Sequence, residues 1–119
     1  LLFQEQEREQ KSKNEAFLDA IKQFVQKNLK EDLSLTYIAQ QLHYNPSYIS
    51  RLFKQLSGRN LSEYIIEEKM AYAKLSLETG DDTVAAIALA VGFESPQYFS
   101  VVFKKQTGMT PGEYRHRFR

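Results

Sequence analysis

The fold is decided by the stretch from Ile87 to Arg115, which reads IALAVGFESPQYFSVVFKKQTGMTPGEYR. Within it, Ser95 followed by Pro96 is typical of a helix start, because a serine hydroxyl accepts a hydrogen bond from a free N–H and proline fits the first turn. Gly108 is typical of the residue just past a helix end, where the backbone turns left-handed. The segment PQYFSVVFKKQT between them is therefore predicted to be a helix.

Another helix is expected immediately before it. The segment TVAAIALAV is predicted to be helical, with a cap at Asp82 and a turn at Gly92-Phe93-Glu94. Beyond Gly108, Thr110-Pro111 is expected to open a short last helix that includes Tyr114. This part of the chain therefore predicts helix, short turn, helix, followed by one further helix.

The same pattern occurs once earlier in the chain. Ile38-Ala39 returns as Ile87-Ala88 at an offset of 49 residues, and eight further residues return at an offset of 50 after a one-residue insertion. The eight pairs are Pro46 with Pro96, Tyr48 with Tyr98, Ser50 with Ser100, Phe53 with Phe103, Lys54 with Lys104, Gly58 with Gly108, Glu63 with Glu113, and Tyr64 with Tyr114.

The first copy is predicted to fold in the same way as the second. Ser34 is expected to cap a helix with the sequence LTYIAQQL, and His43-Tyr44 to form the turn. Asn45 is expected to cap PSYISRLFKQLS, which begins at Pro46 and ends before Gly58. The chain therefore contains one motif twice.

Two longer helices are expected around the first copy. Ser12 with Glu15 forms a capping-box pattern, which predicts a helix start. Residues 61–78 predict a connecting helix about 27 Å long at about 1.5 Å per residue. The apolar stripe of the earlier helix, which should face a core, consists of Phe17, Ile21, Phe24, Val25 and Leu29.

The sequence therefore predicts an all-α fold with two helix-turn-helix subdomains joined by a central linker helix. Residues 1–14 are interpreted as a linker or the tail of an upstream helix, because they show no sustained apolar period. The expected bounds of the other parts are 15–60 for the first subdomain, 61–79 for the connecting helix and 80–119 for the second subdomain.

Composition narrows the class of protein. The 119 residues are 42% hydrophobic, which is enough for a core, and no run approaches the roughly 18 apolar residues that a membrane helix needs. The absence of cysteine excludes disulfides, thiol nucleophiles and thiolate metal sites. No secretory leader is recognisable, so a cytoplasmic location is expected. Because the chain starts at Leu1 rather than at a methionine, we expect it to be part of a longer protein.

The net charge of +1 conceals an uneven distribution of charges. Residues 34–62 contain Arg51, Lys54 and Arg59 and no acidic residue, and residues 95–112 contain Lys104 and Lys105 and no acidic residue. Each of these two windows includes the second helix of a predicted helix-turn-helix. Locally basic helices of this kind favour contact with a polyanion such as DNA.

The helical period separates a core face from an outer face in both second helices. Ile49, Leu52, Phe53 and Leu56 should face inward in the first, and Phe99, Val102 and Phe103 in the second. The outward positions are predicted to read base edges in a major groove, since arginine pairs with guanine, glutamine with adenine and valine contacts a thymine methyl. These base-reading candidates are Ser47, Ser50, Arg51, Gln97, Ser100 and Val101.

A second set of residues is predicted to contact phosphates. Lysines one turn further along each helix reach the backbone, tyrosine hydroxyls border the groove, and capped helix starts present free N–H groups to an anion. The phosphate-contacting candidates are Asn45, Tyr48, Lys54, Ser95, Tyr98 and Lys104.

No residue pattern favours catalysis, a metal or a cofactor. His43 and His116 are far apart and lack the spacing of metal ligands, and Glu67-Glu68 is interpreted as an exposed helix face. The chain is therefore not expected to be an enzyme. A helical protein-interaction module that contacts RNA polymerase or a partner regulator stays open as the alternative to DNA binding.

The stretch from Ile87 to Arg115 resembles the DNA-binding domain of the AraC/XylS transcription regulators. The shared pattern consists of IA, GF, a tyrosine-phenylalanine pair, FK, TG, P and YR, and the resemblance covers residues 16–118. It implies seven helices, recognition helices at residues 45–56 and 95–106, and the six base-reading positions named above. It also implies a bacterial regulator, most often an activator, with an upstream effector or dimerisation domain, promoter or operator DNA as partner, and contact with RNA polymerase.

Three positions depart from the family pattern. His43 stands where the second copy has Gly92, at a turn position that needs a positive φ. Val101 replaces the polar or basic residue of many relatives, which predicts weaker or more apolar readout. Because Ser47 and Ser50 are small, base specificity in the first helix is expected to depend on Arg51.

Overall fold

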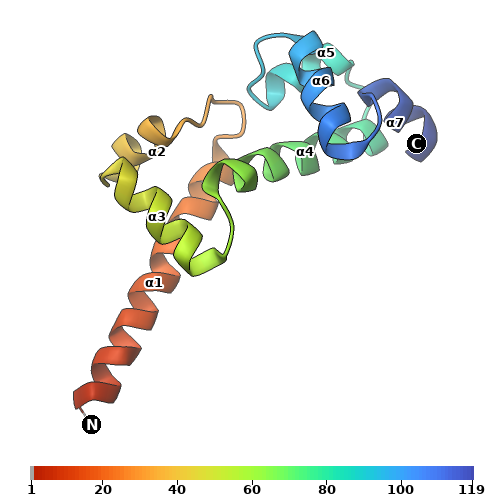
Figure 1. Ribbon diagram of the computed structural model, residues 1–119. Coiled ribbons are helices and arrows are strands. Elements are labelled where there is room, and N and C mark those ends of the chain that lie inside the picture. Colours follow the sequence, from red (N-terminus) through yellow and green to blue (C-terminus); the bar gives the residue numbers. More distant parts are fainter. Residues whose placement is uncertain (1) are drawn as a thin grey trace. The chain divides into compact units, whose positions relative to one another are not determined.

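The computed structural model describes residues 2–119, and the described residues form seven helices and no strand (Figure 1). The all-α class and the two helix-turn-helix motifs with a linker helix between them are confirmed. The helices are α1 (Leu2–Lys27), α2 (Leu35–Leu42), α3 (Pro46–Ser57), α4 (Leu61–Thr79), α5 (Val84–Ala90), α6 (Pro96–Thr107) and α7 (Pro111–Phe118).

The chain divides into two compact units. The first contains the residues up to Lys27 together with Leu33–Tyr64, and the second contains Asn28–Asp32 together with Ile65–Arg119. In the first unit the apolar stripe of α1 is buried at Phe17, Ile21 and Val25 and partly buried at Phe24, whereas Leu29, also expected in this stripe, lies beyond the end of α1 and belongs to the second unit. The buried side chains of α1 form a core with buried residues of α2 and α3, namely Ile38, Ala39, Ile49 and Phe53.

The core of the second unit is built from α4 to α7. It consists of Met70, Ala73, Leu77, Ile87, Ala88, Val91, Phe99, Phe103 and Tyr114. The duplication of the sequence is visible in how the aromatic rings pack within each unit. Phe53 meets Tyr64 edge-on with ring centroids 5.5 Å apart, and Phe103 meets Tyr114 edge-on at 5.4 Å. Residues 50 positions apart therefore make the same contact.

Most of the expected helix ends agree with the structure. Asn45 and Ser95 cap the second helix of each motif, and Gly58 and Gly108 follow their last turns with φ of 75° and 84°. Ser34 caps α2 by accepting a hydrogen bond from the Tyr37 N–H. These ends were predictable because each depends on one residue type at a fixed distance from the helix.

Two expected helix starts are wrong. Helix α1 runs without a break from Leu2, so Ser12 and Glu15 lie inside it and form no capping box. Residues 4–15 contain no Gly or Pro and are mostly Gln, Glu, Lys and Arg, which sustain a helix without an apolar stripe. Leu1, the first residue of the expected linker, lies outside the described residues. At α5 the cap is Thr83 rather than Asp82, because the Thr83 hydroxyl is the one that reaches the Ala86 N–H, at 3.1 Å.

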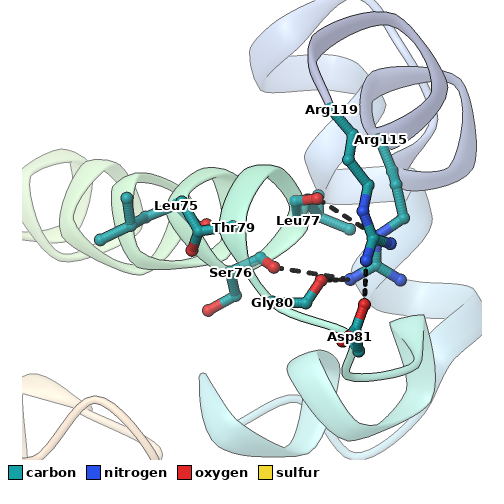
Figure 2. Close-up of polar contacts among 8 residues, drawn as sticks. All are labelled: Leu75, Ser76, Leu77, Thr79, Gly80, Asp81, Arg115 and Arg119. Carbon is teal, nitrogen blue, oxygen red and sulfur yellow. Dashed lines mark hydrogen bonds and ion pairs between the residues drawn. The ribbon is translucent and has the colours of Figure 1, made fainter.

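The arginine of the YR pair, Arg115, holds the end of α4 (Figure 2). Its Nε donates to the Leu77 carbonyl at 3.2 Å, and its Nη2 donates to the carbonyls of Gly80 and Ser76 at 3.4 and 3.5 Å. The last carbonyls of a helix have no intrahelical partner and carry partial negative charge, so a guanidinium stabilises them. Arg119 adds an exposed ion pair with Asp81. The arginine of the YR pair therefore stabilises the second unit.

Candidate nucleic-acid interface

The outer face of α3 carries most of the expected contact residues of the first unit. Ile49 and Phe53 are buried on the inner face, so the periodicity of the helix directs the polar side chains outward. An open surface depression is lined there by Leu35, Ser47, Ser50, Arg51, Lys54 and Gln55. The structure thus brings together all three base-reading candidates of this unit with Lys54, and no acidic residue lines the depression.

Two residues of this depression were missed by the sequence reasoning. Gln55 lies one helical turn after Arg51, on the same face, so the helical period could have identified it. Leu35 is the first residue of α2, and its place beside α3 follows from the packing of the two helices. Sequence spacing alone carries no signal for Leu35.

The start of α3 is fixed by Asn45. Its Oδ1 accepts hydrogen bonds from the backbone N–H groups of Ser47 at 2.9 Å and of Tyr48 at 3.2 Å. The carbonyl end of the Asn45 side chain is therefore used in capping, and its exposed amide NH₂ keeps two donors. A phosphate oxygen can accept a hydrogen bond from such a donor.

Tyr48 packs toward α1 and does not line the depression beside Arg51. Its ring meets the Phe17 ring edge-on at 6.3 Å and stacks on the Tyr44 ring at 6.0 Å, and 43% of the residue stays exposed. It lines a different depression, together with Gln10, Lys13, Asn14, Ala16, Phe17, Tyr44 and Leu52. The Tyr48 ring thus lies apart from the depression that Ser47, Ser50, Arg51 and Lys54 line.

The turn of the first motif has the unusual backbone that its sequence suggests. His43 adopts φ 63° and ψ 43°, the left-handed region, and Gly92 adopts φ 82° at the matching turn of the second motif. Histidine is tolerated in this region better than a β-branched residue. The side chain of His43 is exposed, so no neighbour opposes it.

Helix α6 exposes a similar but more apolar outer face. Phe99 and Phe103 are fully buried, while Gln97, Val101 and Lys104 are exposed. Val101 is 65% exposed, so the outer face of α6 presents an apolar side chain between polar ones. Ser100 is only half-buried, so it offers less surface to a ligand than its counterpart Ser50.

The start of α6 repeats the arrangement at α3. The Ser95 Oγ accepts a hydrogen bond from the Tyr98 N–H at 3.1 Å. The Tyr98 ring lies 5.7 Å from that of Phe93, and Tyr98 is 62% exposed. Both Ser95 and Tyr98 therefore lie at the helix start, where Ser95 is partly exposed and Tyr98 largely exposed.

Each unit thus contains a helix-turn-helix whose second helix buries one face and exposes a polar, locally basic one, the arrangement by which a helix enters a DNA major groove. These features define a DNA-binding domain with two helix-turn-helix motifs. A family profile described as "Helix-turn-helix domain" matches residues 38–117. The chain belongs to the AraC-type helix-turn-helix family of transcription regulators.

Individual relatives agree with this assignment. The chain is 34% identical over 106 residues to the bifunctional transcriptional activator/DNA repair enzyme AdaA of Bacillus subtilis, covering 89% of this chain and 50% of AdaA. It is similar to the C-terminal domain of AraT, a response regulator from Geobacillus stearothermophilus, with a TM-score of 0.81, 31% identity and coverage of 85% and 84% of the two chains.

The third comparison is with a complex. The DNA-binding domain of AdpA, a global transcriptional factor solved with a target DNA, matches with a TM-score of 0.78 and 26% identity over 86% of this chain and 92% of that one. The chain spans half or less of the length of the first curated relatives it matches, from 13% to 50%.

Two further properties complete the description of the surface. Among residues 2–119, no helix is long and apolar enough to cross a membrane. In the same part of the chain, no three His, Cys, Asp or Glu side chains are grouped so that they could hold a metal ion.

Proposed function

We propose that the chain recognises a specific duplex DNA site through two base-reading sets, one on each second helix. The set on α3 is Ser47, Ser50 and Arg51, and the set on α6 is Gln97, Ser100 and Val101. The observation that carries the proposal is the depression on α3, where Arg51 and Lys54 lie together and the lining residues include no acidic one. Such a face attracts a polyanion and offers a bidentate donor to guanine.

Six other residues are proposed to hold the phosphate backbone. Lys54 and Lys104 supply charge, and the cap side chains and the tyrosine hydroxyls supply hydrogen-bond donors. Because the Tyr48 ring packs against Phe17 of α1, the phosphate that Tyr48 contacts in this proposal lies on the α1 side of the first unit. The complete set is Asn45, Tyr48, Lys54, Ser95, Tyr98 and Lys104.

The two second helices are proposed to enter successive major grooves on one side of the duplex. Successive turns of a major groove are about 34 Å apart. Helix α4 has 19 residues, a length of about 28 Å at about 1.5 Å per residue, which suits a spacer of this size. In this proposal residues 15–60 and 80–119 act as the two reading subdomains and 61–79 as the spacer.

The cellular role follows the relatives and is proposed with them. The chain acts as the output part of a bacterial regulator, and it acts as an activator, like AdaA. An effector or dimerisation domain lies upstream of it, as in a response regulator such as AraT, whose similar domain is the C-terminal one. It works in the cytoplasm, contacts RNA polymerase, and acts by binding alone, without catalytic activity, cofactor or metal.

Selection from a random pool of duplexes tests the proposed function. The chain should enrich a motif with two separate conserved blocks, and binding to the enriched duplex should weaken steeply as salt rises, because bound phosphates release counterions. A duplex of shuffled sequence provides the control for specificity. Equal affinity for both duplexes, or no enrichment at all, contradicts the proposal and favours the protein-interaction alternative.

A further inference from the structure

Lys69, on α4, carries a charge inside the second unit. Among residues 2–119, Lys69 is the one charged residue that is buried, with 7% of its surface exposed. Its Nζ donates hydrogen bonds to the carbonyls of Leu29 at 2.6 Å, Val91 at 2.7 Å and Glu31 at 2.9 Å. An ammonium has three protons, so every donor of this buried charge is used.

The three carbonyls come from two segments that are distant in the sequence. Leu29 and Glu31 belong to the segment Asn28–Asp32, and Val91 is the residue that ends α5. The carbonyl at the end of a helix carries partial negative charge, which a cation stabilises. Desolvation by burial lowers the pKa of Lys69, while the charges of Asp32 and then Glu31 oppose that change. The side chain therefore ties the segment 28–32 to the end of α5.

The turn of the second motif begins at this point. Gly92 follows Val91 directly, and a Cβ on Gly92 would lie 2.7 Å from the Glu31 carbonyl oxygen and 2.8 Å from the Lys69 Nζ. The Gly92 N–H donates to the Leu89 carbonyl at 3.0 Å, and the Phe93 N–H donates to the Ala88 carbonyl at 2.9 Å. The backbone of the turn is thus packed against both the segment 28–32 and the lysine.

This turn sets where α6 begins. Phe93 packs its ring against Phe99 at 5.4 Å, and Ser95 caps the helix two residues later. At the matching turn of the first motif His43 is exposed, so that turn tolerates a side chain that the second turn excludes. The second turn is hydrogen-bonded to a buried cation of α4 through the Val91 carbonyl.

We propose that Lys69 is a positioning residue for DNA recognition, which fixes the α5–α6 turn and thereby the orientation of α6, without itself contacting DNA. The inference rests on the proposed function in one respect, that α6 reads bases. The proposal gives a buried lysine on the linker helix a role in the recognition of one half-site. A half-site is the set of base pairs read by one of the two second helices.

The first test needs no DNA. Lys69→Met keeps the length of the side chain and removes the charge and the donors, and Lys74→Met, on the same helix but partly exposed, is the matched control for loss of charge. Amide hydrogen exchange should accelerate at Gly92 and Phe93 in Lys69→Met and stay as in wild type in Lys74→Met. Unchanged exchange at these two amides in Lys69→Met would overturn the proposal.

A measurement on the wild-type chain covers the case in which Lys69→Met does not fold. The ammonium protons of Lys69 should give a separate, slowly exchanging nuclear magnetic resonance signal coupled to the Val91 carbonyl, since all three are bonded in a buried site. Fast exchange of these protons with water would overturn the proposal.

The second test uses the duplex that the wild-type chain selects from a random pool. Hydroxyl-radical footprints should show that Lys69→Met loses protection over one half-site, which is the half-site lost by Gln97→Ala, and keeps protection over the half-site of Arg51. Its affinity should fall about tenfold, as for loss of a good base contact. Equal weakening of both half-sites, as general destabilisation produces, would overturn the proposal. If the wild type selects no duplex, the proposed function fails, and the exchange rate at Gly92 still decides whether Lys69 fixes the turn.

Discussion

Arg51 lines the α3 depression, and its guanidinium can read a guanine with two parallel hydrogen bonds. We predict that Arg51→Ala weakens binding to the selected duplex by about 1 to 3 kcal/mol and relaxes the preference at one base pair, because a bidentate contact to guanine is lost. Titrations against the selected duplex and its single-base variants measure both effects.

Lys54 lies one helical turn after Arg51 on the same face of α3, and Lys54→Ala is the matched control for Arg51→Ala. Lys54→Ala should weaken binding to selected and shuffled duplexes alike and reduce the slope of log affinity against log salt by about one, because a phosphate contact carries no sequence information. If Arg51→Ala behaved in the same way, the assignment of Arg51 as a base-reading residue would be wrong.

Tyr114 links stability to alkaline pH. Burial, then its hydrogen bond to Glu78, then the charge of Glu78 raise the pKa of the Tyr114 hydroxyl to about 12 from 10.0. Because the folded pKa exceeds the unfolded one, the contribution is complete below pH 10 and is lost between pH 10 and about 12.

The comparison with Tyr114→Phe isolates this contribution. The wild-type free energy of unfolding should fall more steeply than that of Tyr114→Phe across this alkaline range, and at neutral pH the variant should be less stable by about 1 kcal/mol, since it lacks one hydrogen bond. Denaturant titrations at a series of pH values measure both. Parallel pH dependences in the two proteins would contradict the raised pKa.

At the scale of single residues, the roles of side chains that recur in both motifs or face outward could be predicted from the sequence. The roles of side chains whose partners are distant in the sequence could not. Arg51 and Val101 follow from the helical period. Lys69 and Arg115 bond to carbonyls 22 to 40 residues away, and a backbone carbonyl has no signature in the sequence. The roles of these two cations became visible only when the helix ends they stabilise were placed beside them.

At the scale of elements, the glycine of the α5–α6 turn, Gly92, can be compared with the glycine that follows α6, Gly108. Gly92 and Gly108 have nearly the same φ, 82° and 84°, but a Cβ at Gly108 meets nothing within 4 Å while one at Gly92 meets the Glu31 carbonyl at 2.7 Å. Gly108→Ala should therefore cost only the left-handed backbone strain, about 1 kcal/mol. Gly92→Ala should cost about 3 kcal/mol or more, since a backbone carbonyl must also move.

Thermal and denaturant unfolding of the two variants provide the measurement. Gly108→Val should likewise act through stability, because a β-branched residue resists the left-handed region more than alanine. Equal losses in Gly92→Ala and Gly108→Ala would show that the close approach of the segment 28–32 to the turn does not persist in solution. Loss of DNA binding in Gly108→Val with unaltered melting would contradict a purely structural role for this cap.

The two wrong helix starts have a common cause. A polar segment such as residues 4–15 gives no periodicity, so Ser12 with Glu15 was the strongest local signal there, yet residue propensity alone extends α1 to Leu2. At α5, Asp82 and Thr83 are both good caps, and the choice depends on where the packed helix begins. Sequence patterns identify helices more reliably than their first residues.

At the scale of the whole molecule, the linker helix belongs to both units. Leu61–Tyr64 packs with the first unit, where it matches the start of α7, and Ile65–Thr79 packs with the second. The duplication therefore shares one helix between its two copies. In the proposed function, a continuous helix, which is stiff compared with a flexible linker, favours one separation between the two half-sites.

This predicts a strict dependence of affinity on the spacing of the half-sites in DNA. Inserting about 5 base pairs, half a helical turn, turns one half-site to the opposite side of the duplex, so affinity should fall to that of a single half-site. Inserting about 10 base pairs returns the half-site to the original side of the duplex but moves it further away than the 19-residue helix α4 can span. Affinity should therefore stay low. Titrations with the spaced duplexes decide between the alternatives: full affinity at either insertion would mean that the two second helices bind DNA independently.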